Sequence, residues 1–372
     1  MLPLIFLVCN ASRAADYYQP GFRTIGQWSD ENQQRVDMNI WYPCNKKPRE
    51  LLYSPWLIRA AKDATPIPGR FPLILISHLS SGDRFSYHEL GAWLASCGFI
   101  VGAPTHIGDC LSNMDFMFSW HQLQSRVTDL SNAIDILLSN DEISLSIDPG
   151  RIGLIGFGTG ATASLLMGGA LPDCSGWPGY CQAARTGDIY CNEWAKQRIN
   201  SICASFPLQK SLADPRVRAI AAVSPGYGMI FGPNSFAYFY PPLLLVDAGR
   251  DIINHPDLHG AAIAALIGRK VTRIIIPDAD QGALMSACPD SLASELPDLC
   301  LSVSQDERRH THQRLRETIG DFFLHYLGGN GNLPDIPSPP DLSPKPMGIE
   351  KTSPTRAVRK RPKRSATREP DF

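Results

Sequence analysis

The fold class is decided by the stretch Arg151-Ile-Gly-Leu-Ile-Gly156-Phe-Gly158-Thr-Gly160-Ala-Thr-Ala-Ser164. Its apolar first part is typical of a strand that is buried on both faces. The glycines at positions 156, 158 and 160 predict a tight turn, because glycine adopts backbone conformations that other residues avoid. The residues after the turn predict a helix that begins at once. A buried strand, a sharp turn and a helix in direct succession indicate an α/β protein.

The same alternation continues on both sides of this stretch. Residues 36–42 alternate between polar and apolar and predict an early antiparallel strand. Runs rich in Ile, Val and Leu predict further strands at residues 71–77, 99–103, 151–155, 217–223, 242–246 and 271–276. Helices are predicted at residues 87–97, 121–138, 159–168, 256–267 and 306–327. Together they predict a doubly wound, mostly parallel sheet flanked by helices.

Composition excludes several classes of protein. The chain has 372 residues, of which 44% are hydrophobic and 19% charged, so it is too apolar to be wholly disordered. No apolar run after residue 8 approaches the roughly 18 residues that span a bilayer, which excludes a polytopic membrane protein. The net charge of −1 argues against a dedicated nucleic-acid binder.

The two ends of the chain differ from its middle. Residues 1–15 are apolar and then small, and they predict a secretory signal that is cleaved after Ala14 or Ala15. Residues 16–327 are expected to form the globular domain. Residues 328–372 are rich in proline and then basic, and they predict a disordered tail. The basic run in this tail could touch nucleic acid or anionic lipid, but a solvated tail is the simpler expectation.

Cysteine usage also favours export. Four of the ten cysteines lie in a polar insertion at residues 171–212, and their spacing suits disulfides better than the close pairs of a zinc site: Cys174, Cys181, Cys191 and Cys203. Cys288 and Cys300 bracket a second polar loop and could close it, and Cys97 is the candidate odd cysteine. The pairing cannot be assigned from the sequence. We expect a secreted or periplasmic protein with no metal site.

Several motifs resemble the α/β-hydrolase superfamily, and more narrowly its secreted branch akin to dienelactone hydrolases and platelet-activating-factor acetylhydrolases. The resemblance covers roughly residues 20–327. The motifs that carry it are the glycine turn itself, Gly21-Phe-Arg-Thr, Ile40-Trp-Tyr-Pro43, Phe71-Pro-Leu-Ile-Leu-Ile-Ser-His78-Leu-Ser-Ser-Gly82, Gly98-Phe-Ile-Val-Gly-Ala-Pro104-Thr-His106, the pair Arg126 and Asp129, Asp148-Pro-Gly-Arg-Ile-Gly, and Asp306-Glu-Arg308 with His312.

The resemblance implies a catalytic triad that this sequence lacks in part. In the superfamily the turn is G-x-S-x-G, and its central serine is the nucleophile. Here the central residue is Gly158, which has no nucleophile. The resemblance places the acid of the triad at Asp251 and its histidine at the position of Gln281, and a carboxamide cannot exchange protons near neutral pH. The resemblance assigns the oxyanion hole to the backbone N–H groups of Leu79 and Thr159. The family usually has glycine at the position of Leu79.

These departures predict an exported hydrolase-fold protein that has lost catalysis, needs no cofactor and keeps a pocket for an ester or lipid-like small molecule. Its oligomeric state is left open. One alternative is an active carboxylesterase or lipase-like hydrolase with a relocated nucleophile at Ser80 or Ser81, although neither serine has an obvious base. The histidines at 78 and 106 are expected in loops or in the core, and those at 255 and 259 at the surface.

A second alternative is an NAD-binding oxidoreductase, because Gly156-x-Gly158-x-x-Ala161 matches the dinucleotide fingerprint. That fingerprint requires an acidic residue about 20 positions later, at the end of the next strand. The residue near that spacing is Asp173, which falls in the cysteine-rich segment instead. The sequence therefore favours the hydrolase interpretation.

Overall fold

The computed structural model describes residues 18–29, 34–205, 211–267 and 271–328. The chain forms two compact units, Met1–Pro339 and Pro340–Phe372, of which the second lies outside the described residues. The predicted signal and all of the predicted tail beyond residue 328 also lie outside them.

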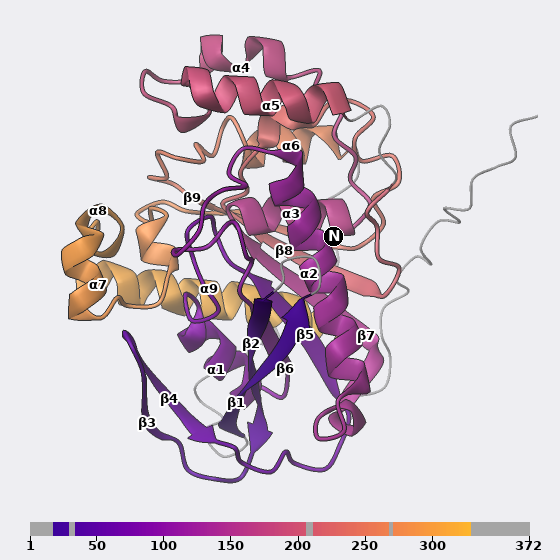
Figure 1. The fold of residues 1–372 in the computed structure, drawn as a ribbon, viewed down its shortest axis with the longest axis vertical. Helices are drawn as coiled ribbons and strands as arrows, with labels where there is room; N and C mark the ends of the chain where they lie inside the picture. The colour runs from indigo at the N-terminus through magenta and orange to yellow at the C-terminus, as the bar shows by residue number, and fades with distance from the viewer. Residues whose placement is uncertain (1–17, 30–33, 206–210, 268–270, 329–372) are drawn as a thin grey trace, which may run out of the picture. The chain divides into compact units, whose positions relative to one another are not determined.

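A ten-stranded sheet runs through the described part of the first unit, in the order β10-β9-β8-β7-β5-β6-β2-β1-β4-β3 (Figure 1). From β6 to β10 in this order every neighbouring pair is parallel, whereas β2 pairs antiparallel with both β6 and β1, and β3 with β4. The strands are β1 (Gln19–Ser29), β2 (Gln34–Cys44), β3 (Arg49–Tyr53), β4 (Trp56–Lys62), β5 (Phe71–Ser77), β6 (Ile100–Pro104), β7 (Ile147–Phe157), β8 (Val217–Val223), β9 (Leu243–Ala248) and β10 (Thr272–Ile276).

Helices cover both faces of the sheet. The longer ones are α1 (His88–Ser96), α2 (Trp120–Ser139), α3 (Thr159–Met167), α5 (Glu193–Ser205) and α9 (Gln305–Tyr326), and the shorter ones are α4 (Trp177–Ala183), α6 (Gly260–Leu266), α7 (Asp290–Glu295) and α8 (Pro297–Cys300). Single 3-10 turns are η1 (Ser144–Ser146), η2 (Ile189–Cys191), η4 (Gly228–Ile230) and η5 (Gly282–Leu284).

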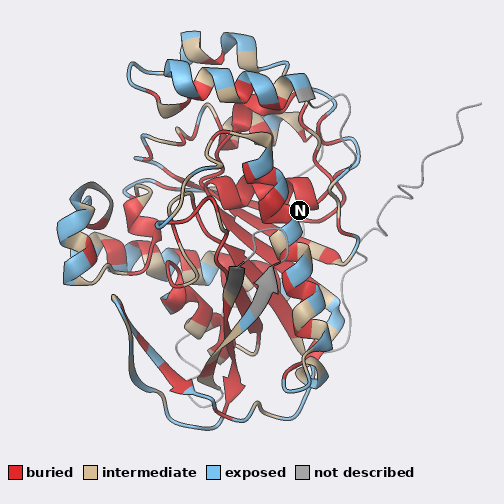
Figure 2. Cartoon of the chain, viewed as in Figure 1, coloured by how far each residue is buried: buried red, intermediate tan, exposed pale blue. Residues whose placement is uncertain are grey.

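The central strand β5 shows why the sheet is buried on both sides. Leu73 and Leu75 belong to the core cluster that contains the apolar face of α2 and all of α3's large side chains. Ile74 belongs to the opposite cluster, with the apolar faces of α1 and α9. Alternate side chains of a strand point to opposite faces, so an unbroken apolar run needs a cover on each. Figure 2 shows the central strands as the most continuously buried part of the fold.

The predicted doubly wound sheet is confirmed. The predicted strands at 71–77 and 217–223 coincide with β5 and β8, and the other predicted strands and helices overlap observed ones. The predictions missed β1, the β3–β4 hairpin and the four helices α4, α5, α7 and α8. These elements lack a long buried run. Every residue of β3, for example, is exposed or half-buried.

Three disulfides are present among the described residues, as the cysteine spacing predicted. Cys174 pairs with Cys203, Cys181 with Cys191, and Cys288 with Cys300. The first two tie α4, η2 and α5 into what we call the disulfide-bearing segment (residues 174–203), which lies between α3 and β8. Cys44, Cys97 and Cys110 keep their thiols. No helix in the described ranges combines the length and hydropathy that a bilayer crossing needs.

Candidate site at the glycine turn

Close backbone packing fixes the turn between β7 and α3. A Cβ atom on Gly156 would lie 2.2 Å from the carbonyl oxygen of Gly160, and one on Gly160 would lie 2.2 Å from that of Ser77. Neither position accepts a side chain. Gly158 has φ +56° and ψ −117°, its N–H donates to the Val223 carbonyl at 3.0 Å, and its own carbonyl accepts from the N–H of Gly226 at 3.1 Å. The chain is therefore held in a sharp, left-handed bend.

A side chain at position 158 would point at three neighbours. Its Cβ would lie 3.3 Å from Leu79 Cβ, 3.6 Å from Asn254 Nδ2 and 3.7 Å from Gln281 Nε2. The structure thus brings together three residues that the sequence singled out, at positions 79, 158 and 281. It adds Asn254, which the sequence analysis missed. Both polar neighbours are carboxamides, and neither can take a proton from a nucleophile near neutral pH.

Asp251 follows β9 and is 2% exposed. Its Oδ1 accepts from the backbone N–H groups of Ile253 at 2.8 Å and Asn254 at 2.9 Å, so it shapes the turn that presents Asn254. The hydroxyl of Ser224 is a further polar neighbour of this carboxylate. Burial raises the pKa of this carboxyl, while the two N–H groups lower it. The residue expected to be the acid is thus buried and bonded within its own turn.

The two expected oxyanion residues lie on either side of the bend. Thr159 is the first residue of α3, and its N–H belongs to the first turn of a helix, where no intrahelical acceptor exists. Leu79 is 5% exposed, and its side chain contacts the space that a residue at position 158 would enter. Tyr87 stacks on Phe157 with ring centroids 3.6 Å apart. Burial raises the pKa of the Tyr87 hydroxyl, which therefore stays neutral.

A buried arginine holds the loop that carries Leu79. Arg126 of α2 has no exposed surface, and its Nε donates to the Asp109 carboxylate at 2.7 Å. Its remaining donors reach the carbonyl oxygens of His78, Leu79 and Asp109. The position of Leu79 is thus set by an ion pair in the core rather than by the turn itself.

A Ser–His–Asp chain of hydrogen bonds lies next to the turn. Ser77 Oγ is 2.9 Å from His106 Nε2, and His106 Nδ1 is 2.8 Å from Asp129 Oδ2. This is the order of atoms in a catalytic triad. However, Ser77 and His106 have no exposed surface, and Arg126 also donates to the serine oxygen at 3.3 Å. A substrate has no route to this hydroxyl in the structure, and His106 lies in the core, one of the two locations expected for it.

The alternative nucleophile Ser80 has no histidine partner. Its hydroxyl bonds to the Thr159 hydroxyl at 2.8 Å and to the Asp109 carboxylate at 3.3 Å, and it accepts from Gln122 Nε2 at 3.1 Å. Neighbouring Ser81 adopts φ +62°. Among the described residues, the hydroxyl of Ser80 thus bonds to Thr159, Gln122 and the ion-paired Asp109, and to no histidine.

One histidine prediction was wrong. His259 is fully buried, not at the surface: its Nδ1 accepts from the Gly228 N–H at 3.0 Å, and its Nε2 is 3.0 Å from the Tyr180 hydroxyl. Burial lowers the pKa of His259 to about 3. The Tyr180 hydroxyl in turn donates to Asp188, so this histidine anchors the disulfide-bearing segment. His255 is half-buried.

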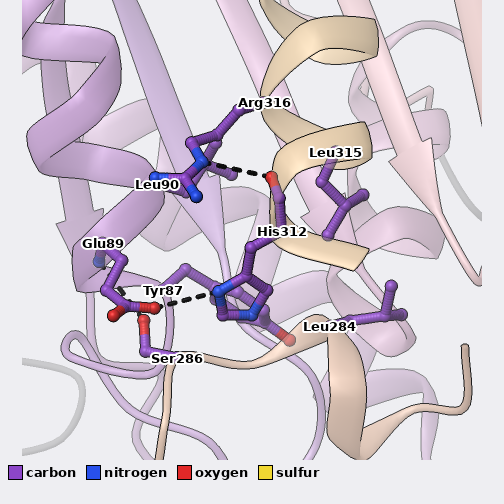
Figure 3. Close-up of a pocket in the computed structure, with 8 residues that line it drawn as sticks. All are labelled: Tyr87, Glu89, Leu90, Leu284, Ser286, His312, Leu315 and Arg316. Atoms are coloured by element: carbon purple, nitrogen blue, oxygen red, sulfur yellow. Dashed lines mark hydrogen bonds and ion pairs between the residues drawn. The ribbon is translucent and has the colours of Figure 1, made fainter. Parts of the chain in front are cut away.

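A small pocket lies close to the site, between the start of α1, η5 and α9 (Figure 3). His312 joins its two sides: Nδ1 is 3.0 Å from the Glu89 carboxylate, and Nε2 is 2.7 Å from the Met285 carbonyl. Its lining residues are Tyr87, Glu89, Leu90, Leu284, Ser286, His312, Leu315 and Arg316. Only Tyr87 among them also borders the turn. The pocket therefore adjoins the candidate site without containing Gly158, Asp251 or Gln281.

Solved structures with a similar fold exist. A ferulic acid esterase from Streptomyces cinnamoneus superposes with a TM-score of 0.55 at 15% sequence identity, over 90% of this chain and 94% of that chain. The chain has an α/β-hydrolase fold. We call the β7–Gly158–α3 bend the elbow, because α/β hydrolases carry their nucleophile on a strand-to-helix turn of this kind.

A putative dipeptidyl aminopeptidase IV from Bacteroides ovatus also matches, with a TM-score of 0.45 and 12% identity over 83% of this chain and 36% of that one. No protein-family profile and no curated protein sequence matches the chain.

Proposed function

We propose that this α/β-hydrolase-fold protein binds a small ester or lipid-like molecule and does not hydrolyse it at the elbow. The supporting observation is the surroundings of Gly158, whose missing side chain would face the carboxamides of Asn254 and Gln281. Among the described residues, neither Gly158 nor its three nearest neighbours supplies a nucleophile or a base. Removing triad members from a working hydrolase lowers the rate by ~10⁴- to 10⁶-fold, so the elbow keeps at most a trace of activity.

We also propose that the protein works outside the reducing cytosol. Its three disulfides support this, because such bonds persist in oxidising compartments. The signal-like residues 1–15 support the same proposal from the sequence.

The test compares binding with turnover on the purified full-length chain. p-Nitrophenyl butyrate is equilibrated with the protein, and the bound ester is recovered and counted as intact or cleaved. A fluorophosphonate probe is applied in parallel, because it marks any serine that a base activates. We expect intact bound ester and no labelled serine. Cleavage at an ordinary enzymatic rate would contradict the proposal.

Two variants sharpen this test. Gly158→Ser alone should stay unlabelled, because Gln281 cannot accept the hydroxyl proton. Gly158→Ser combined with Gln281→His should gain labelling, because the new imidazole would face the new hydroxyl. Equal labelling of the single and double variants would show that another group serves as the base.

A second candidate function is ester hydrolysis by Ser77, which the 2.9 Å and 2.8 Å contacts through His106 to Asp129 favour. The burial of both side chains opposes it. Probe labelling of the wild-type chain that disappears in Ser77→Ala, with the fold intact, would establish this candidate over the first.

A further inference from the structure

The disulfide-bearing segment reaches into the candidate site through one side chain. Tyr190 lies on η2 and is 3% exposed. Its hydroxyl donates to Asn254 Oδ1 at 2.8 Å and lies 2.7 Å from where a Cβ of Gly226 would be. The N–H of Gly226 in turn binds the Gly158 carbonyl. Gly226 is thus the one residue between the Tyr190 hydroxyl and Gly158.

Asn254 transmits this contact to the elbow. Its Nδ2 donates to the Ser224 carbonyl at 3.1 Å and lies 3.6 Å from the position of a Cβ on Gly158. Because Tyr190 occupies its Oδ1, both ends of the carboxamide are held. The amide plane is therefore fixed against the elbow for as long as Tyr190 stays in place.

The other two neighbours of Gly158 are anchored in the core. Leu79 belongs to the loop held by Arg126. Gln281 directly precedes η5, where the buried Arg308 donates to the carbonyl oxygens of Gly282 and Met285. Asn254, by contrast, is held on one side by the Ser224 carbonyl and on the other by Tyr190 of the disulfide-bearing segment. Asn254 is therefore the neighbour of Gly158 whose contacts a movement of the disulfide-bearing segment would change.

Tyr190 is itself kept in place by a short closed loop. Cys191, the residue after Tyr190, forms a disulfide with Cys181, and this bond spans 10 residues. Asp188 accepts from the Tyr190 N–H at 2.9 Å and from the Tyr180 hydroxyl at 3.0 Å. The Tyr190 ring packs edge-on against Tyr227 at 5.2 Å and against Phe118 at 5.5 Å. Burial raises the pKa of the phenol, which keeps it neutral and able to donate.

We propose that Tyr190 is a latch over the elbow, and that a ligand reaches Gly158 only when residues 188–191 lift and release Asn254. The proposal rests on the proposed function, because it describes how a ligand would enter that same site. Displacing the latch breaks the Tyr190–Asn254 hydrogen bond and exposes the tyrosine ring, while the sheet and its glycine turn stay intact. The disulfide limits how far the loop can move.

The test places a thiol at the elbow. In Gly158→Cys, the rate of alkylation of residue 158 by iodoacetamide is followed by peptide mass spectrometry, which separates it from the native thiols. We expect slow alkylation in this parent. Adding Tyr190→Ala, or Cys181→Ala with Cys191→Ala, should raise the rate about tenfold or more, because local opening then loses a buried contact or a tether. Tyr190→Phe should give a smaller rise, since it removes only the hydrogen bond.

Trp194→Ala is the matched control. Trp194 is an aromatic residue of the same segment, is 49% exposed and packs on Phe118 rather than on Asn254. It should leave the rate at that of the parent. Equal rates in the parent and in Tyr190→Ala would overturn the latch.

A second measurement serves if Gly158→Cys does not fold. Hydrogen exchange of residues 251–256 is compared between Tyr190→Ala and Trp194→Ala in the otherwise unchanged chain. Faster exchange in the tyrosine variant alone supports the latch, and equal exchange overturns it. Neither measurement involves ester cleavage, so wild-type turnover would defeat the proposed function without affecting this result.

Discussion

The Nε2 of Gln281 lies 3.7 Å from the point that a Cβ of Gly158 would occupy. Two positions that are 123 residues apart in the sequence thus face each other as a nucleophile and its base would, and neither has the chemistry for that role. Under the proposed function, this is the arrangement of a hydrolytic site without its reactive atoms. The pairing also makes the site testable, because each position has an obvious replacement.

The three glycines of the turn should respond differently to alanine. In Gly158→Ala the new Cβ makes a tight 3.3 Å contact with the Leu79 side chain and the backbone keeps a strained φ, so we expect a loss of about 1–3 kcal/mol in the free energy of unfolding. Gly160→Ala meets the Ser77 carbonyl oxygen at 2.2 Å and should cost more or prevent folding. Urea unfolding of the two variants measures the difference. Equal losses would mean that the turn is looser than its backbone contacts imply.

Removing the buried Arg126 should leave the carboxylate of Asp109 buried without a counter-charge and so lower stability. Arg126→Met leaves Asp109 without its partner, and breaking a buried ion pair in this way costs about 3–5 kcal/mol. Asp109→Asn in the same chain should recover part of that loss, because it removes the unpaired charge. Denaturant unfolding of the single and double variants checks both values. A double variant no more stable than Arg126→Met would contradict the expected coupling.

Acid should destabilise the protein through His259. The pKa of this buried imidazole is lowered to about 3, below its ordinary value of 6.5. Between these values the unfolded chain binds a proton that the folded chain does not, so the stability that is present above pH 6.5 falls as the pH falls towards 3. At pH 5.5 one such histidine accounts for a loss on the order of 1 kcal/mol.

His259→Gln isolates this contribution, because it removes the titration and keeps a side chain that can form hydrogen bonds. The unfolding free energies of wild type and variant are measured at neutral and at acidic pH. The difference between the two proteins should shrink on acidification. A constant difference would show that His259 does not titrate in this window.

The two disulfides of the disulfide-bearing segment should differ in their effect on stability. The bond between Cys174 and Cys203 closes a span of 29 residues, and the bond between Cys181 and Cys191 closes one of 10. Loop entropy predicts losses of about 3–4 and about 2–3 kcal/mol when each pair is replaced by alanine. Thermal unfolding measures both losses, and peptide mapping without reductant checks the pairing. A larger loss for the shorter loop would mean that native contacts outweigh chain entropy.

The sequence predicted what local pattern controls. The apolar runs at 71–77 and 217–223 coincide with β5 and β8, because a strand buried on both faces leaves an unbroken hydrophobic run. The glycine spacing located the bend, since only glycine fits where backbone meets backbone. The parallel order of the strands then brings positions 79, 158 and 281 together.

Side chains placed by long-range contacts could not be predicted. Asn254 owes its position to the turn capped by Asp251, and Tyr190 owes its position to a disulfide whose pairing the sequence left open. His259 was expected at the surface because nothing in its neighbourhood along the chain shows that Tyr180 will cover it. In each case the decisive contact comes from a segment distant in sequence.

The bend at Gly158 also bears on how such a site changes over generations. At φ +56° any residue except glycine carries a conformational penalty, so a change from another residue to glycine at this position relaxes the fold, and the reverse change strains it. Selection for catalysis can maintain a residue that carries this penalty. Without that selection, the mutation to glycine that abolishes the reaction also increases the stability of the fold. Under the proposed function, the change to glycine at this bend is therefore easier than the change back to a reactive residue.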